Sequence, residues 1–232
     1  MLKSDKLTRM FGSKAAVNQV TMTLEPGHVY AMLGPNGSGK TTWMKMAAGL
    51  MKPTSGEIAF EGSPVGVESR RRIAYMSTEP YFYPWMTVDS AGKYYEDFFE
   101  DFSMDRFRQL LAHMELTPEL KTKTLSSGMA AKLKIALTLA RDASVYMLDE
   151  PFNGIDLLAR DEIRQCILDH AAPEKILLLS SHLVEEMEAI ADRAIFIRQG
   201  ELVELRDLEE MRETDGVSMA DRYREIYGHM GE

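Results

Sequence analysis

The sequence predicts an α/β domain whose central sheet is mostly parallel. Short, continuously apolar runs alternate with longer segments of helical periodicity, which is typical of parallel strands joined by crossover helices. The runs are residues 29–33, 145–148 and 176–179, which read VYAML, VYML and ILLL. Strands without a polar alternation are covered on both faces, so we expect helices on each side of this sheet.

Composition and charge limit the function classes. The chain has 232 residues, of which 45% are hydrophobic and 27% charged, so it can bury a large core. A net charge of -9 repels polyanions, and we expect no nucleic-acid partner. The single cysteine, Cys166, cannot form an intramolecular disulfide and is expected in the core. No signal peptide and no apolar run near the roughly 18 residues of a membrane span is present, which favours a cytoplasmic chain.

Three helices are expected between the apolar runs. They extend from Lys40 to about Gly49, from about Met129 to Arg141, and from Asp156 to about His170. Glycine is common just past a helix end, and aspartate is a favoured N-cap, so Gly49 and Asp156 are natural boundaries.

Two further segments have a different character. Alternating apolar and polar residues at 20–24 and 57–60 predict a small antiparallel sheet exposed on one face. Residues 81–128 have helical periodicity and contain half of the chain's Trp, Tyr and Phe residues, which indicates a helical insertion. We therefore expect one domain over 1–232. Residues 1–80 and 129–205 form its core and β-subdomain, 81–128 a helical subdomain, and 206–232 a short helical tail.

The strongest motif lies between the first apolar run and the first helix. It reads Gly34-Pro35-Asn36-Gly37-Ser38-Gly39-Lys40-Thr41-Thr42, the pattern and context of a phosphate-binding P-loop. Its glycines let backbone N–H groups face phosphate oxygens at the positive end of a helix. Lys40 would neutralise the β- and γ-phosphates, and Thr41 would offer a hydroxyl to Mg²⁺. The predicted ligands are thus ATP and Mg²⁺.

Two acids follow the apolar run 145–148. Ligands collect at the carboxyl ends of parallel strands, where Asp149 and Glu150 are expected. Asp149 is placed to hold Mg²⁺ directly or through water, and Glu150 to orient or deprotonate an attacking water.

Three more motifs complete a resemblance to a known family. They are Leu125-Ser126-Ser127-Gly128-Met129 ahead of a helix, Asn153-Gly154-Ile155-Asp156, and Ser180-Ser181-His182 after a strand. In order along the chain, the five motifs resemble those of the ATP-binding subunit of an ABC transporter, including its LSGGQ signature, D-loop and switch histidine. The resemblance covers nearly the whole chain. It implies a P-loop NTPase core with a mostly parallel sheet, a small N-terminal antiparallel β-subdomain and an inserted helical subdomain.

The resemblance also implies roles. Two ATP-binding subunits would dimerise around MgATP and drive transport through separate transmembrane subunits on the cytoplasmic face of the cell membrane. Ser126 and the N–H of Gly128 would close over the γ-phosphate held by the partner. His182 would contact that phosphate and keep Glu150 and water in line. Phe11 fits the aromatic residue that stacks on adenine. The sequence from Leu125 through Asp156, together with the short tail, resembles the bacterial exporter type, so export is expected.

The sequence departs from the family at two places. Thr78 stands where the Q-loop glutamine is expected, so either the following Glu79 substitutes for it or water completes the metal shell. Ser127 and Met129 replace a glycine and a glutamine of the signature. A positive φ at residue 127 would cost a serine roughly 1 kcal/mol. These departures predict a functional but slow site.

The segment Thr78–Trp85 is the expected docking site of the permease. Its aromatic part, Tyr81–Trp85, directly follows the loop where the family's transmembrane partner inserts a short helix, and aromatic rings are common anchors at interfaces. For the rings of residues 94–102, the alternative is that i,i+4 pairs pack the helical insertion itself.

Two alternative functions remain open. One is a soluble ABC-type ATPase that acts on DNA, ribosomes or Fe–S assembly; the net charge, the single P-loop and the lack of a long coiled-coil insertion oppose the first two. The other is a non-hydrolytic or low-activity subunit of a heterodimer, suggested by Thr78, Ser127 and Met129 and opposed by Glu150.

Overall fold

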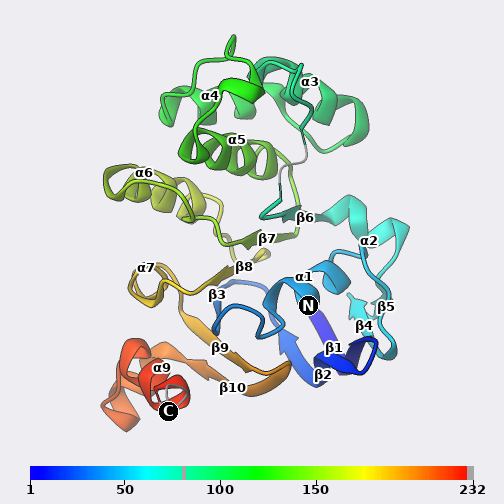
Figure 1. Cartoon of the computed structure of the whole chain (residues 1–232), viewed down its shortest axis with the longest axis vertical. Helices are drawn as coiled ribbons and strands as arrows, with labels where there is room; N and C mark the ends of the chain where they lie inside the picture. Colours follow the sequence, from blue (N-terminus) through cyan, green and yellow to red (C-terminus); the bar gives the residue numbers. More distant parts are fainter. Residues whose placement is uncertain (80–81, 229–232) are drawn as a thin grey trace.

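The computed structural model describes residues 1–79 and 82–228 and contains two sheets (Figure 1). The smaller sheet is antiparallel, with the strand order β2-β1-β4-β5. Its strands are β1 (Leu2–Phe11), β2 (Lys14–Leu24), β4 (Ser55–Phe60) and β5 (Ser63–Pro64). The predicted pieces 20–24 and 57–60 lie within β2 and β4, so the small antiparallel sheet is confirmed.

The larger sheet has the strand order β10-β9-β3-β8-β7-β6. Its strands are β3 (His28–Leu33), β6 (Ile73–Met76), β7 (Val145–Asp149), β8 (Ile176–Ser181), β9 (Arg193–Arg198) and β10 (Glu201–Asp207). Every neighbouring pair is parallel except β9 and β10. The expectation of a mostly parallel central sheet is therefore confirmed.

Each face of the larger sheet has its own hydrophobic core, as the continuous apolar runs predict. Along β3, Val29, Ala31 and Leu33 belong to one core, whereas Tyr30 and Met32 belong to the other. The second core also contains α1 (Lys40–Ala47), which lies with its buried Trp43 between the two sheets. Because α1 packs between the two sheets, the segment that connects β3 to α1 is held in place. This segment is the glycine-rich loop.

The helical part lies above the sheets in Figure 1 and consists of α3 (Val88–Phe98), α4 (Met104–His113), the 3₁₀ turn η1 (Thr122–Thr124) and α5 (Ser127–Leu139). Another helix, α2 (Val67–Arg72), precedes β6. Helix α5 packs on α3 and α4 and also on β6 and β7, so it joins the helical part to the core. It begins two residues before the expected Met129, because the Ser126 hydroxyl caps it.

The aromatic residues of α3 divide into two groups. Tyr95 and Phe99 pack against the core of the helical part, and their rings lie 5.3 Å apart. Tyr94 and Phe98 form a second pair, with ring centroids 4.7 Å apart, but both are exposed. Packing of the insertion thus explains the first pair only. Tyr81, part of the expected docking segment, lies outside the described residues.

The remaining helices follow the later strands. They are α6 (Leu157–Leu168), α7 (Val184–Glu188), α8 (Leu208–Glu210), the π-helical turn η2 (Met211–Asp215) and α9 (Met219–Tyr227). Asp156 caps α6 as expected, with its carboxylate 3.0 Å from the backbone N of Ala159. Within residues 1–79 and 82–228, no helix has both the length and the apolar composition of a membrane span.

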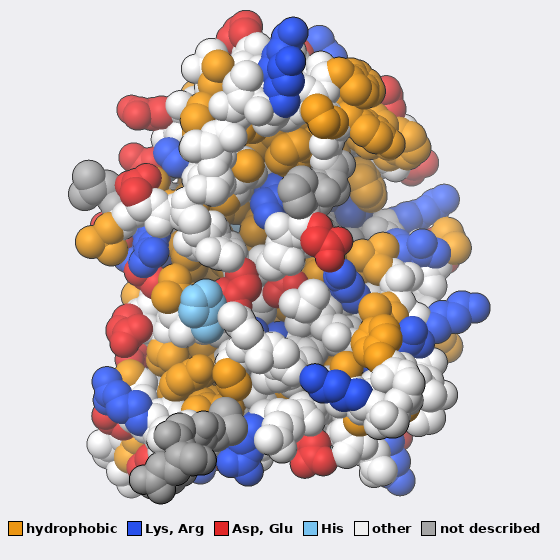
Figure 2. All heavy atoms as spheres, in the orientation of Figure 1, with side chains coloured by type: hydrophobic (Ala, Val, Ile, Leu, Met, Phe, Trp, Pro, Cys, Tyr) orange, Lys and Arg blue, Asp and Glu red, His pale blue; other side chains and the backbone are white. Residues whose placement is uncertain are grey.

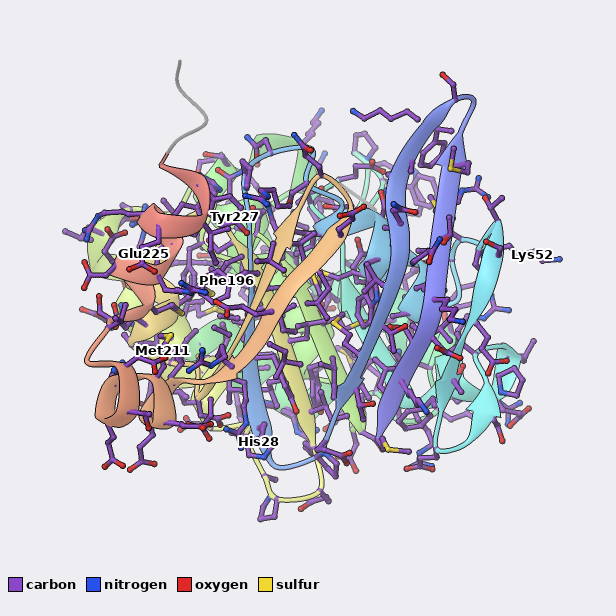
Figure 3. The ribbon with its side chains drawn as sticks, turned by 90° about the horizontal axis from the view of Figure 1, so that it is seen from below. His28, Lys52, Phe196, Met211, Glu225 and Tyr227 are labelled. Atoms are coloured by element: carbon purple, nitrogen blue, oxygen red, sulfur yellow. The ribbon has the colours of Figure 1, made fainter. Side chains whose placement is uncertain are left out.

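The tail packs beside the larger sheet near β9 and β10 (Figure 3). The Tyr227 hydroxyl lies within hydrogen-bond distance of the carbonyl oxygens of Leu33 at 3.1 Å and Ile197 at 2.9 Å. Burial raises the pKa of Tyr227 far above its usual value, so the phenol is a neutral donor. The tail is thereby attached to the last residue of β3, directly before the glycine-rich loop.

Candidate functional site

The loop from Gly34 to Gly39 requires glycine at two positions because neighbouring strands approach its backbone closely. A Cβ on Gly34 would lie 2.4 Å from the carbonyl oxygen of Ile197. A Cβ on Gly39 would lie 2.4 Å from that of Ala16, and Gly39 also has a φ of 111°. The loop can therefore curl tightly against β2 and β9 and start α1 at Lys40.

The Lys40 side chain is buried within this curl. Its Nζ donates to the carbonyl oxygens of Gly34 at 2.6 Å and Pro35 at 3.3 Å, and it lies 3.8 Å from Oε1 of Glu150. Burial lowers the pKa of Lys40, and the charges of Glu150 and Asp149 oppose that shift. A buried cation beside a glycine-rich turn favours a bound anion.

Glu150 connects this lysine to the switch histidine. Its Oε2 lies 2.9 Å from Nδ1 of His182, while its Oε1 faces Lys40. Its backbone has a positive φ of 52°, which is strained for a non-glycine residue. The N–H of Glu150 donates to the backbone and hydroxyl oxygens of Ser180, both at 3.1 Å, and these bonds stabilise the turn. The structure thus brings together Lys40, Glu150 and His182, the three expected catalytic residues.

Asp149 is fully buried at the end of β7. The Ser180 hydroxyl donates to its Oδ1 at 2.5 Å, and the Tyr75 hydroxyl donates to its Oδ2 at 3.3 Å. Sequence reasoning assigned no role to Tyr75. The available signal was that Tyr75, a residue with a hydroxyl group, lies in a short apolar strand next to the strand that carries Asp149.

A cavity of about 420 Å³ lies over the loop. Residues 36–42 line it, together with Phe11, Thr78, Glu150 and His182. Inside it, the Ser38 hydroxyl is buried and has no hydrogen-bond partner. An orphaned donor beside a buried cation fits a phosphate group. The Thr41 hydroxyl lines the cavity, whereas the fully buried Asp149 carboxylate is not among the described residues that line it. Both groups are hard oxygen donors of the kind that Mg²⁺ prefers.

Phe11 lies at the end of β1, beside the same cavity. Its ring is 49% exposed, and the guanidinium of Arg9 lies 4.9 Å from the ring centroid. Adenine stacking on Phe11 remains a prediction.

The signature segment lies elsewhere. Ser126 caps α5 by accepting a hydrogen bond from the N–H of Met129 at 3.2 Å. Ser127 is the first residue of α5 and has no positive φ, so the strain that a left-handed conformation would impose does not arise. Its hydroxyl donates to the carbonyl oxygen of Gly154 at 3.4 Å, and Gly128 packs on the same oxygen. Among the described residues that line the loop's cavity, none belongs to 125–129.

The loop after β6 carries Thr78 and Glu79. Thr78 lines the cavity, whereas the Glu79 carboxylate pairs with Lys45 at 3.3 Å and is not among the residues that line it. The Lys134 ammonium, on α5, donates to the carbonyl oxygens of Ser77 at 3.0 Å and Thr78 at 2.9 Å. In this arrangement Glu79 does not replace the missing glutamine. Lys134, which sequence reasoning did not single out, holds the loop through these two hydrogen bonds.

Comparison with known families decides the identity. A family model described as "ABC transporter" matches residues 17–153, which include the glycine-rich loop, the signature and the acidic pair. The chain belongs to the ABC transporter family. As an ABC ATP-binding domain it binds nucleotide, and it is an ATPase.

Similar proteins agree with this assignment. The chain is 34% identical over 219 residues to YcbN of Bacillus subtilis, an uncharacterized ABC transporter ATP-binding protein, covering 91% of this chain and 71% of YcbN. It is 33% identical over 205 residues to SrtF of Streptococcus pyogenes, a lantibiotic transport ATP-binding protein, covering 88% and 89% of the two chains. These relatives are ATP-binding subunits of transport systems, and so is this chain.

Solved structures show the same fold. An ATP-binding subunit of an ABC transporter superposes with a TM-score of 0.86 at 26% identity, covering 97% of this chain and 99% of that one. The cassette MJ0796, described as dimeric, post-hydrolysis and bound to ADP and Pi, superposes with a TM-score of 0.80 at 21% identity. This second match covers 90% of the ABC domain described here and 99% of MJ0796.

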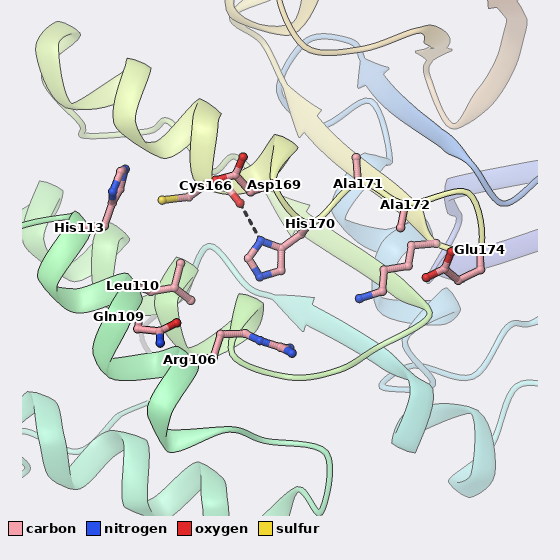
Figure 4. A pocket seen from close by; sticks show the side chains of 11 residues that line it. Arg106, Gln109, Leu110, His113, Cys166, Asp169, His170, Ala171, Ala172 and Glu174 are labelled. Atoms are coloured by element: carbon pink, nitrogen blue, oxygen red, sulfur yellow. Dashed lines mark hydrogen bonds between the residues drawn. The ribbon is translucent and has the colours of Figure 1, made fainter.

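A second cavity of the ABC domain, about 450 Å³, is separate from the loop (Figure 4). It lies between α4 and the end of α6, with Arg106, Cys166 and His170 in its wall. Burial lowers the pKa of His170, and the charges of Arg106 and Lys175 act in the same direction. Cys166 is buried as expected, and burial raises the pKa of its thiol to about 11. The cavity contains a thiol with a raised pKa and side chains of both charges. This lining indicates no specific chemistry.

Proposed function

We propose that this chain hydrolyses ATP as half of a dimer that closes around two MgATP molecules and powers transport through separate transmembrane subunits. The observation that carries the proposal is the connection of Lys40, Glu150 and His182 beside the phosphate-binding loop. These three side chains provide a cation for the phosphates, a carboxylate for the water and a polar group that orients this carboxylate.

Each group of residues in the site has its own role in ATP hydrolysis. The backbone N–H groups of residues 34–42 and the ammonium of Lys40 bind the phosphates. Thr41 and Asp149 would hold Mg²⁺, which supplies charge neutralisation of the phosphate oxygens when it is bound. Glu150 orients the attacking water and accepts its proton, and His182 holds the carboxylate in place.

The position of the signature supports the proposed dimer. Ser126 and Gly128 lie outside the cavity of their own phosphate loop, so within one chain that cavity lacks them. A second copy can present its α5 N-terminus, with its positive dipole end, to the γ-phosphate. The dimeric state of MJ0796 supports this arrangement.

The transmembrane partner is proposed to dock at an aromatic groove between the helical part and the core. This groove has a volume of about 610 Å³, and Leu50, Tyr75, Tyr94 and Phe98 contribute to its wall. Near α3, hydrophobic side chains gather on the surface (Figure 2). The occupant would be a short apolar segment of the membrane subunit, because such a segment matches exposed rings.

The same surface includes part of the expected docking segment. Tyr83 and Trp85 are stacked, with ring centroids 5.6 Å apart, and Trp85 is 70% exposed. Tyr83 also meets Tyr94 edge to face at 6.3 Å, so the aromatic surface is continuous from the loop to α3. The similarity to a lantibiotic transport protein supports a role in transport, for which export is the proposed direction.

The experiment compares ATP turnover by the purified chain with that of Glu150→Gln, and records each protein's mass in solution with and without ATP. We expect Mg²⁺-dependent turnover in the wild type. In the variant, turnover should fall by at least about 100-fold, because the water loses its base, while ATP stabilises a dimer. Tight ATP binding with no turnover in the wild type would instead show that this chain depends on a second, different ATPase subunit.

A further inference from the structure

Tyr75 touches both the aromatic groove and the acid of the nucleotide site. Its side chain lines the groove of about 610 Å³ and an adjoining cavity of about 130 Å³. Its hydroxyl donates to Oδ2 of Asp149 at 3.3 Å. Because β6 pairs in parallel with β7, with Tyr75 opposite Met147, the ring lies beside the end of the acid-bearing strand. One side chain therefore spans from a surface groove to a fully buried carboxylate.

The hydroxyl of Tyr75 donates to one oxygen of the Asp149 carboxylate. The other oxygen of Asp149 accepts from Ser180. The direction of the carboxylate is thus fixed by two hydroxyl groups, one of which belongs to a ring in the wall of the groove.

The chain after Tyr75 is attached to both neighbouring parts of the molecule. Lys134, from α5, donates to the carbonyl oxygens of Ser77 and Thr78, and Lys45, from α1, pairs with Glu79. The groove lies between these parts. A change in the groove can therefore move the end of β6 through two attachments, one to α5 and one to α1.

We propose that Tyr75 is the positioning residue through which an occupant of the aromatic groove acts on ATP hydrolysis. An apolar segment packed against the ring sets the place of the hydroxyl, and the hydroxyl sets the direction of Asp149 toward Mg²⁺. Groups that orient a metal ligand typically change metal affinity by tenfold or more when they are removed. The proposal rests on the proposed function, because it takes the groove as the docking site of the membrane partner.

The first test is Tyr75→Phe, which keeps the ring and removes the hydroxyl. Thermal melting of the full chain with a non-hydrolysable ATP analogue, repeated over a range of Mg²⁺ concentrations, gives the half-saturating Mg²⁺ concentration without turnover. We expect that concentration to rise by roughly five- to tenfold. Tyr30→Phe is the matched control, since the Tyr30 hydroxyl also makes hydrogen bonds, but with the backbone of Glu25, which precedes β3 at the end away from the phosphate loop. A half-saturating concentration equal to that of the wild type would overturn the proposal.

The second test fills the groove. Leu50 is 60% exposed and lines both cavities beside Tyr75, so Leu50→Trp adds an apolar group where an occupant would lie. We expect L50W to change the half-saturating Mg²⁺ concentration by about twofold or more, and to lose this effect in the Y75F background. Val67→Trp, at another exposed apolar residue that does not line the groove, should change nothing.

Equal effects of L50W in both backgrounds, or no effect in either, would show that the groove does not act through Tyr75. Both tests use the isolated chain, and both are read from melting rather than from transport. Their failure would leave the turnover and dimerisation of the proposed function intact. Failure of turnover in the wild type would in turn leave the Mg²⁺ measurements valid.

Discussion

The two sides of the nucleotide site differ in how far a single chain completes them. At the phosphate loop, Lys40, Glu150 and His182 are connected side chain to side chain within one chain. At the signature, Ser126 and Ser127 are exposed, and their contacts go to their own helix and D-loop. The phosphate loop, the acidic pair and the histidine match their motifs residue by residue, whereas the signature departs from its motif at Ser127 and Met129. Thr78, in the wall of the phosphate-loop cavity, is the one departure on the first side. The phosphate-loop side is therefore connected within one chain, whereas the contacts of the signature serve its own helix start and the D-loop.

Removing His182 should give a large loss of turnover on the phosphate-loop side of the site. His182→Ala deletes the group 2.9 Å from Glu150 and leaves that carboxylate without its orienting partner. We expect kcat to fall by roughly 100-fold, with the KM for ATP nearly unchanged, because the phosphate loop is intact. Steady-state kinetics give both constants. A loss confined to KM would mean that His182 binds nucleotide rather than orienting Glu150.

Removing Lys40 tests both nucleotide binding and folding stability at the phosphate loop. Lys40→Met deletes a buried cation whose ion-pair partner, Glu150, lies 3.8 Å away. We expect nucleotide affinity to fall by at least about 30-fold, the equivalent of about 2 kcal/mol for a buried charged contact. The melting temperature without nucleotide should fall, because Glu150 and the carbonyl oxygens of Gly34 and Pro35 lose their buried partner. Calorimetric titration and thermal melting check the two parts, and a wild-type affinity would contradict the assigned role.

Restoring the family residue at the signature is the smallest change. Ser127→Gly returns the glycine, but residue 127 is helical and has no positive φ, so glycine relieves no strain. We expect turnover within about twofold of the wild type and stability lowered by about 0.5 kcal/mol, the usual penalty of glycine in a helix. Chemical denaturation and ATPase assays measure these values. A tenfold rise in turnover would show that Ser127 slows the enzyme.

Local patterns predicted the elements whose causes are local. The glycine-rich turn, the Asp156 cap and the apolar strands each depend on a few neighbouring residues, and the structure contains all three. The roles of Tyr75 and Lys134 depend on partners 74 and 56–57 residues away, at Asp149 and at the 77–78 loop. No periodicity marks such long-range pairs, because the pairing of β6 with β7 brings Tyr75 to Asp149 and the packing of α5 on β6 brings Lys134 to the 77–78 loop.

The extent of the helical insertion was predicted less fully than its existence. The aromatic-rich pattern indicated helices after residue 81, but α5 starts at Ser127, because capping by Ser126 adds two residues before the expected start at Met129. Likewise, i,i+4 spacing could not tell the packed Tyr95 and Phe99 from the exposed Tyr94 and Phe98. Both pairs have the same spacing, and only the packing of α3 on its neighbours separates them.

The attachment of Tyr227 to Leu33 has a consequence for biosynthesis. The two residues are 194 positions apart, and β3 pairs only with β8 and β9 among the described strands. A ribosome therefore releases the phosphate loop long before the strands and helix that hold it in place exist. Because ATP stabilises only the folded form, nucleotide cannot favour the nascent chain until residues near 227 have emerged.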